Sequence, residues 1–222
     1  MFDAVIFDMD GVVADSEPLH IKAENKTLAP FKVQVTKKDY REFMGRSTKL
    51  LLKSLIKKYS LDVELEELFT IHKKNLVQLY NSEVTPIKGA LELIEYLTER
   101  HYPLALASSS SSQLVDAVIS KFKIKDRFKA VVSGSEVNNL KPAPDIFLKA
   151  AQCLSVPPEN SLVIEDSTAG VKAAKSAKMF CVGFRSPHSP EQDFSLADKI
   201  INDLTVFSDM IQSQSLEAVI FS

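Results

Sequence analysis

The chain has 222 residues, of which 45% are hydrophobic and 25% charged, which is typical of a globular domain long enough to bury a core. A formal net charge of −2 does not favour nucleic acid or an anionic membrane as a partner. The N-terminus lacks the basic segment of a signal peptide, and no apolar run reaches membrane-spanning length. We therefore expect a cytoplasmic protein in which Cys153 and Cys181 are buried free thiols. The sequence does not reveal the oligomeric state, and a monomer is the default expectation.

The predicted elements begin with Ala4–Phe7, a short apolar run typical of a strand buried on both faces. Residues 16–83 then show helical spacing of leucines, with no strand-like run among them. From residue 84 onward strands and helices alternate. The expected strands are 104–107, 130–133, 162–164, 180–182 and 199–201, and the expected helices are 90–100, 114–122, 146–154, 169–177 and 206–213.

This alternation predicts an α/β fold, with a Rossmann-like parallel sheet covered by helices on both faces. The first strand is separated from the others by the helical block. The simplest organisation is therefore a core of residues 1–15 and 84–222 with an inserted α-helical cap domain, residues 16–83.

Polar residues follow four of the predicted strands, and ligands of open parallel sheets bind beyond the carboxyl ends of strands. Each of these segments also has an ordinary structural explanation. An Asp-x-Asp-Gly segment is a common turn, a serine run is often a linker, a Lys-Pro pair suits an exposed loop, and two acids suit a helix start. Their coincidence at successive strand ends favours a site. The segments are Asp8 with Asp10, the run Ser108–Ser112, Lys141-Pro142, and Glu165-Asp166.

The residue types in this group suit one chemistry. Carboxylate oxygens are the ligands that Mg²⁺ prefers, and without a cation they would raise one another's pKa values. A lysine, a hydroxyl and a helix N-terminus can hold phosphate oxygens. Phosphoryl transfer needs mainly positioning and charge neutralisation, so the group predicts a phosphoryl-transfer site in which an aspartate attacks phosphorus.

Four segments resemble the four motifs of the haloacid dehalogenase-like superfamily, in order and spacing. They are "DMDGVVADS" at 8–16, "LALASSS" at 104–110, "KPAPDIF" at 141–147 and "EDSTAGVKAAKSA" at 165–177. Within that superfamily the chain is most similar to the branch of small phosphatases and β-phosphoglucomutases with a helical cap. The resemblance implies a Mg²⁺-dependent enzyme that acts on a small phosphorylated metabolite.

The resemblance also implies roles for individual residues. Asp8 would be the nucleophile, and Asp10 the general acid/base that also lends its main-chain carbonyl to Mg²⁺. The second aspartate argues against a true dehalogenase, because dehalogenases of this superfamily lack it. Ser108, Ser109 and Lys141 would bind the phosphoryl group, and Glu165 and Asp166 would complete the metal site with Asp8 and Asp10.

Candidates in the helical insertion are fewer and have ordinary alternatives. Gly45 and Arg46 resemble a cap loop that faces the substrate, although Arg46 also suits a plain surface. His20 lies where the mutases carry a histidine that couples cap closure to catalysis, and a solvated helix histidine is the alternative. Lys74 resembles a lysine that faces the active site in the mutases, but it also suits an exposed helix face.

One departure favours a phosphatase acting on a sugar phosphate over a β-phosphoglucomutase. Shortly after the cap-loop glycine, the mutases carry an arginine that binds the second phosphate of a bisphosphate. Thr48 stands at that position in this chain. Arg46 or Lys49 could substitute, so the mutase stays the alternative. A receiver domain, a different class, is disfavoured because no aspartate directly follows the strand 130–133. A non-catalytic phosphate-binding module stays open.

Overall fold

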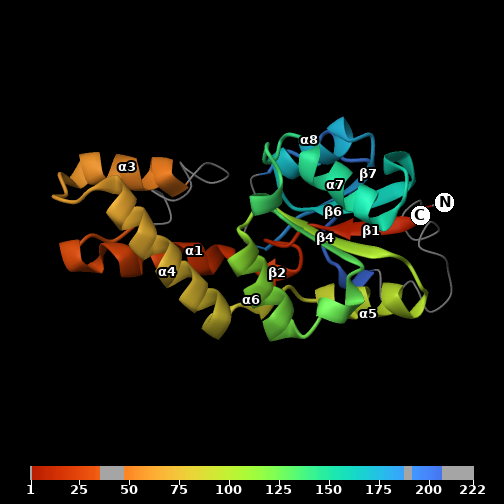
Figure 1. The fold of residues 1–222 in the computed structure, drawn as a ribbon, viewed down its shortest axis with the longest axis horizontal. Coiled ribbons are helices and arrows are strands. Elements are labelled where there is room, and N and C mark those ends of the chain that lie inside the picture. The colour runs from red at the N-terminus through yellow and green to blue at the C-terminus, as the bar shows by residue number, and fades with distance from the viewer. Residues whose placement is uncertain (1, 36–47, 188–191, 207–222) are drawn as a thin grey trace. The chain divides into compact units, whose positions relative to one another are not determined.

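The structure is a computed structural model, and it describes residues 2–35, 48–187 and 192–206. The chain divides into two compact units, one of residues 1–15 and 85–222 and the other of Ser16–Val84. We call them the core unit and the helical unit. Val84, which we expected in the core, belongs to the helical unit. Figure 1 labels their elements.

The core unit contains a six-stranded parallel sheet in the order β5-β4-β1-β6-β7-β8. The strands are β1 (Ala4–Phe7), β4 (Leu104–Ser108), β5 (Ala130–Ser133), β6 (Ser161–Glu165), β7 (Phe180–Phe184) and β8 (Lys199–Ile201). The expected α/β fold with a parallel Rossmann-like sheet is confirmed. The chain runs outward from β1 through β4 to β5 and then returns to the other side of β1 as β6. The topological switch point, where such sheets bind ligands, therefore lies between β1 and β6.

Helices cover both faces of this sheet (Figure 1). One face carries α7 (Asp145–Leu154), which contacts β4, and α8 (Thr168–Ser176), which contacts β6 and β7. Small β4 residues such as Ala105 and Ala107 share one hydrophobic cluster with residues of α7. The other carries α5 (Ala90–Glu99) and α6 (Ser112–Phe122). Short 3-10 helices span Lys125–Arg127, Gly134–Glu136 and Pro158–Asn160. The helix expected over 206–213 lies almost wholly outside the described residues.

A second, two-stranded antiparallel sheet stands where the core chain leaves for the helical unit and returns. It pairs β2 (Ala14–Asp15) with β3 (Thr85–Pro86), with Asp15 opposite Thr85. The sequence did not predict it, because a two-residue strand leaves no pattern of alternating hydrophobicity.

The helical unit is built from α1 (Glu17–Leu28), a 3-10 turn (Ala29–Phe31), α3 (Thr48–Tyr59) and α4 (Leu65–Glu83). A leucine-rich cluster forms its core. Polar residues also lie between α1 and α4, where the Asn75 amide donates a hydrogen bond to the Thr27 hydroxyl at 3.1 Å. Glu24 and His72 are buried as well. Within the described chain, one carboxyl oxygen of Glu24 and both ring nitrogens of His72 lack a hydrogen-bond partner.

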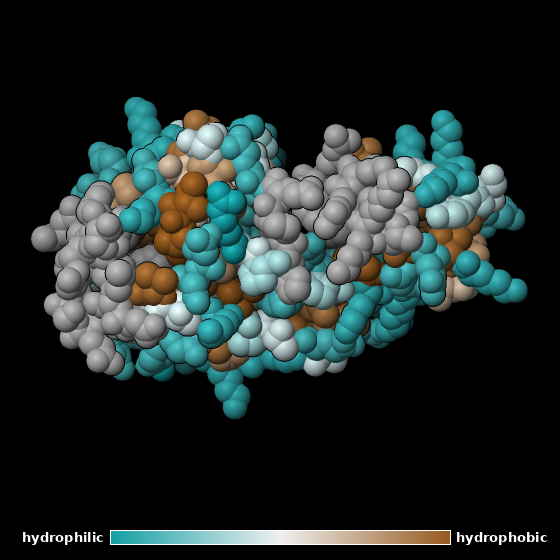
Figure 2. Space-filling model, turned by 180° about the vertical axis from the view of Figure 1, so that it is seen from behind, coloured by the Kyte–Doolittle hydropathy of each residue, from teal (hydrophilic) through white to brown (hydrophobic). Residues whose placement is uncertain are grey.

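The surface is mainly hydrophilic on the face that Figure 2 shows, with hydrophobic residues in separate patches. Within the described residues, no helix has the length and apolar character needed to cross a membrane. Cys181 is a buried free thiol as expected, but Cys153 is exposed, so that part of the prediction is wrong. Cys153 occupies a solvent-facing position of the amphipathic helix α7, whose buried face is formed by residues such as Phe147 and Ala150.

Candidate active site

The carboxyl ends of β1 and β6 bring three acids together at the switch point of the sheet. Asp8 directly follows β1, and its backbone N–H donates to the carbonyl of Ile164 in β6 at 3.0 Å. Glu165 is the last residue of β6 and Asp166 follows it. Because the strands are parallel and in register, residues far apart in sequence come side by side.

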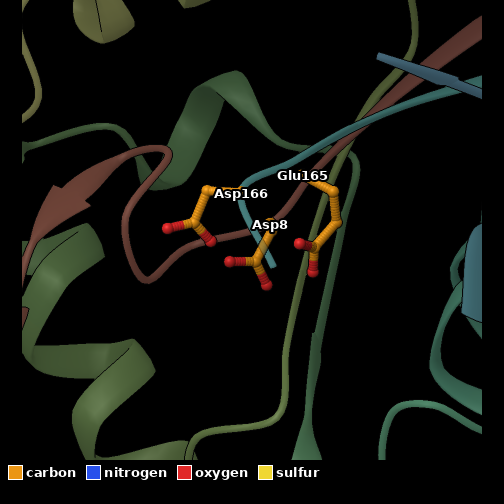
Figure 3. A group of neighbouring side chains, drawn as sticks. All are labelled: Asp8, Glu165 and Asp166. Carbon is orange, nitrogen blue, oxygen red and sulfur yellow. The ribbon is translucent and has the colours of Figure 1, made fainter. Parts of the chain in front are cut away.

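Figure 3 shows the carboxyl groups of Asp8, Glu165 and Asp166 pointing toward one another. One oxygen from each lies within 4.8 Å of the other two, and all three residues are buried. Burial raises the pKa of Asp8 above its usual range, and the charges of Glu165 and Asp10 add to this effect against that of Lys141. Burial and the charge of Glu165 likewise raise the pKa of Asp166. Three hard oxygen donors, two of them from carboxyl groups whose pKa is raised, fit a divalent cation such as Mg²⁺.

Lys141 supplies the positive charge of the site. Its ammonium group contacts a carboxyl oxygen of Asp8 and donates to Glu165 Oε1 at 2.7 Å and to the carbonyl of Ala107 at 3.3 Å. Burial alone would lower the pKa of Lys141, but the charges of Asp8 and Glu165 outweigh it and hold the pKa above the ordinary lysine value. The lysine therefore stays charged and holds the two carboxyl groups on either side of it.

Glu165 is fixed from its other side by the start of α8. Its Oε2 accepts the Ser167 N–H at 2.6 Å and the Ser167 hydroxyl at 3.0 Å. The Ser167 hydroxyl oxygen in turn accepts the N–H of Gly170 at 3.0 Å and caps the helix. A Cβ atom at Gly170 would lie 1.7 Å from Glu165 Oε1, so only glycine leaves room for this carboxylate.

Asp10 lies on the turn after β1, and its contacts come from the end of β4. Its Oδ2 accepts the hydroxyl of Ser108 at 3.1 Å and that of Ser110 at 2.7 Å. The Asp10 side chain does not belong to the group of three carboxylates that could hold a metal. The resemblance assigns it to the metal only through its main-chain carbonyl. Gly11 follows with a φ of 82°, and a Cβ there would lie 1.9 Å from Asp166 Oδ2.

Most of the site residues that we expected in the core unit are thus brought together. Asp8, Lys141, Glu165 and Asp166 form one contact network, and Ser108 reaches Asp10. Ser109 is exposed, whereas its neighbour Ser108 is fully buried.

The expected residues of the helical unit are more dispersed. Gly45 and Arg46 lie outside the described residues. The Nε2 atom of His20 lies 3.2 Å from the hydroxyl of Tyr80, which joins α1 to α4. Lys74 is exposed on α4. Roles for His20 and Lys74 stay predictions.

Sequence reasoning overlooked Ser110, Ser167 and Gly170. Ser110 had a detectable signal, because residues two apart at a strand end share one side and Ser108 was already a candidate. Ser167 also had one, since a serine directly before a predicted helix is a typical N-cap. The demand for glycine at position 170 depends on the depth to which Glu165 is buried, which no local pattern reveals.

Comparisons with known proteins agree with this geometry. Residues 5–184 match the model of the family described as haloacid dehalogenase-like hydrolase. The chain is 31% identical over 175 residues to a phosphorylated carbohydrates phosphatase from Thermotoga maritima, covering 79% of this chain and 81% of that protein. It is 34% identical over 190 residues to a β-phosphoglucomutase from Bacillus subtilis, covering 81% and 82%.

Among solved structures, that of a mutant of CbbY from Rhodobacter sphaeroides in complex with xylulose-(1,5)bisphosphate superposes with a TM-score of 0.81 at 26% identity, covering 92% of this chain and 95% of that one. The chain spans only 18% of a larger relative, the chloroplastic protein SUPPRESSOR OF QUENCHING 1 from Arabidopsis thaliana, with 36% identity over 189 residues. The chain therefore belongs to the haloacid dehalogenase-like hydrolase family, in its phosphatase and phosphoglucomutase branch, and is a phosphoric monoester hydrolase.

Proposed function

We propose that the protein is a Mg²⁺-dependent phosphatase that hydrolyses a small sugar phosphate through an aspartyl-phosphate on Asp8. The observation that carries this proposal is the contact network of Asp8, Lys141 and Glu165 beside Asp166, at the switch point of a parallel sheet. Such a network keeps one carboxyl group in a fixed position next to a permanent positive charge. That is the arrangement a nucleophile needs when it approaches an anionic phosphoryl group.

The metal would be held by the carboxylates of Asp8 and Asp166, by Glu165, and by the main-chain carbonyl of Asp10. When bound, Mg²⁺ would neutralise charge on the transferring phosphoryl oxygens. The remaining neutralisation comes from Lys141, whose charge does not depend on pH in the physiological range. Ser108 would donate a hydrogen bond from its hydroxyl group to a phosphoryl oxygen.

Two chemical steps follow. A carboxyl oxygen of Asp8 attacks phosphorus, the bond to the sugar oxygen breaks, and that oxygen takes a proton from Asp10. Asp10, now ionised, removes a proton from a water molecule, whose oxygen attacks the phosphorus of the aspartyl-phosphate. The Asp8–phosphate bond breaks, phosphate leaves, and both aspartates return to their starting state.

The proposed substrate class is supported by the relatives. The Thermotoga maritima protein is named for phosphorylated carbohydrates, and the CbbY structure contains a sugar bisphosphate. We assign selection among sugar phosphates to the helical unit, acting as a cap. The catalytic groups named above all come from the core unit.

A β-phosphoglucomutase is the second candidate, because the Bacillus subtilis mutase is 34% identical. A mutase must grip a second phosphate, and Thr48 stands where the mutases carry an arginine for that purpose. Lys49, a possible substitute, directs its ammonium group to Glu66 at 2.7 Å. The phosphatase is therefore favoured.

The test is a phosphate-release screen with Mg²⁺ over phosphosugars, nucleotides and other phosphomonoesters. It includes β-glucose 1-phosphate with a sugar bisphosphate as activator. We expect sustained phosphate release that is lost in Asp8→Asn by more than about a thousandfold. Isomerisation of β-glucose 1-phosphate with little net release would identify a mutase. Unchanged turnover in Asp8→Asn would refute the nucleophile, and no turnover of any ester would leave a phosphate-binding module.

A further inference from the structure

Two hydroxyl groups converge on the same oxygen of Asp10. Ser110 donates to Oδ2 at 2.7 Å and Ser108 donates to it at 3.1 Å. A carboxyl group fixed by two donors on one oxygen cannot rotate freely about its Cβ–Cγ bond, so the direction of its other oxygen is also fixed. Ser110 makes the shorter of the two bonds.

Ser110 is itself held in place by its backbone. Its N–H donates to the Ser108 hydroxyl oxygen at 3.0 Å, and its carbonyl accepts the N–H of Gly134, at the end of β5, at 2.9 Å. A Cβ on Gly134 would lie 2.2 Å from the carbonyl oxygen of Ser109, so the two loops touch closely. The Ser110 hydroxyl is therefore presented from a segment anchored at the ends of two strands.

Ser108 alone cannot keep the Asp10 carboxyl group oriented during the proposed reaction. Its single hydroxyl proton points to Asp10 Oδ2 in this structure, and in the proposed function it turns to the phosphoryl group. When it does, Ser110 is the hydroxyl that stays on Asp10. We propose that Ser110 is a positioning residue, which keeps the Asp10 carboxyl group aimed at the leaving oxygen while Ser108 binds phosphate; this inference rests on the proposed function.

The step that depends on this positioning is the first one. As the Asp8 oxygen bonds to phosphorus, the phosphorus–sugar oxygen bond breaks, and the sugar oxygen receives its proton from Asp10. An alkoxide is a poor leaving group and needs this proton, whereas p-nitrophenolate leaves without it. A misplaced Asp10 should therefore slow transfer from an alkyl phosphate far more than transfer from p-nitrophenyl phosphate.

The experiment compares kcat/KM of Ser110→Ala for p-nitrophenyl phosphate and for the best sugar phosphate of the screen, because kcat/KM reports the steps up to the first transfer. We expect a loss of about tenfold with the sugar phosphate and less than about twofold with the aryl ester. Ser110→Thr keeps a hydroxyl and should recover most of the loss. The matched control is Ser120→Ala, an exposed serine of α6 outside the serine run that follows β4, and it should match the wild type.

A double-mutant cycle with Asp10→Asn separates this inference from the proposed function. If Ser110 acts through Asp10, adding Ser110→Ala to Asp10→Asn should change the sugar-phosphate rate by less than about twofold. An equal loss with both esters, or full additivity in the cycle, would overturn the positioning role. If Asp10→Asn alone kept the wild-type rate, the proposed function would fail instead.

Discussion

Lys141 lies with its ammonium group against Asp8 and Glu165, and all three side chains are almost completely withdrawn from water. Removing one partner from a buried ion pair leaves an uncompensated charge, which costs far more than the loss of a surface pair. Lys149, on α7, makes a surface pair with Glu136 at 3.2 Å, and its side chain is 35% exposed. Lys141 and Lys149 therefore allow a direct comparison of a buried and an exposed ion pair within one unit.

We predict that Lys141→Met lowers the free energy of unfolding by about 3–5 kcal/mol and abolishes turnover. Lys149→Met should cost at most about 1 kcal/mol and keep turnover. Urea denaturation followed by circular dichroism, together with phosphate release, measures both effects. Equal losses of stability in the two variants would show that the buried Lys141 network contributes no more to the free energy of unfolding than the exposed Lys149–Glu136 pair.

The residue scale also shows what could be inferred from sequence. Asp8, Lys141, Glu165 and Asp166 were predictable because each lies at the end of a strand or in the loop after it, and parallel strands bring their carboxyl ends to one edge. Ser110 and Gly170 were missed because their roles depend on side-chain packing across loops. The exposed Cys153 was wrongly placed, since an apolar helical pattern tells how much of a helix is buried but not where its boundary with solvent falls.

At the scale of elements, α1 and α4 carry an unusual pair of buried ionisable groups. Burial raises the pKa of Glu24 to about 8 and lowers the pKa of His72 to about 4. Both side chains are therefore mainly neutral at pH 7, Glu24 protonated and His72 deprotonated. Burying a polar group without a partner costs about 1–3 kcal/mol, so the unpartnered Glu24 Oε2 and His72 ring nitrogens lower the stability of the helical unit.

The two groups give opposite pH dependences. An unfolded glutamate near its usual value releases its proton well below pH 8, so the folded state binds more protons between about pH 4.5 and 8. Burial of Glu24 therefore lowers the folding stability progressively as the pH rises through this window to about 8. For His72 the unfolded state binds more protons between about pH 4 and 6.5, so stability falls as the pH drops through that range.

We predict that Glu24→Gln removes part of the decline in stability between pH 6.5 and 8, a difference in slope of up to about 1.4 kcal/mol per pH unit. Denaturation curves at several pH values measure the slope. Glu83→Gln is the control, because Glu83 lies at the end of α4 in an exposed pair with Lys22. Identical slopes for wild type and Glu24→Gln would mean that Glu24 is ionised in the folded protein.

For the elements as a whole, sequence patterns predicted the strands of the sheet well, since buried parallel strands are continuous apolar runs. The boundaries moved by one or two residues, for example from 104–107 to Leu104–Ser108. The β2–β3 pair could not be predicted, because two-residue strands depend on contacts between segments that lie about seventy residues apart.

At the scale of the whole molecule, metal binding and folding should be coupled. The three carboxylates come together only when β1 and β6 pair, so the unfolded chain offers no comparable site. A ligand that binds only the folded state stabilises it by about 2.7 kcal/mol at a hundred times its Kd. A bound cation also favours the ionised form of Asp8 and Asp166, whose pKa values burial raises.

We predict that MgCl₂ raises the Tm of the protein, that EDTA reverses the rise, and that Asp166→Asn removes it. Differential scanning calorimetry without substrate measures the shift independently of activity. Glu159→Gln, an exposed acid of the same unit, should keep the full response. If Asp166→Asn responded like the wild type, the cation would bind elsewhere.

The pairing of β2 with β3 has a consequence for how such a chain can be rearranged. Asp15 lies opposite Thr85, so the core polypeptide departs and returns as the two arms of a β-hairpin whose loop is Ser16–Val84. The entropic cost of closing a loop increases only slowly with its length, so the hairpin tolerates loops of very different size. A two-residue Asn-Gly turn joining Asp15 to Thr85 should yield a folded core that still responds to Mg²⁺ in calorimetry. The insertion is then an exchangeable module, and foreign helical modules grafted between the same two residues could redirect one catalytic core to new phosphate esters.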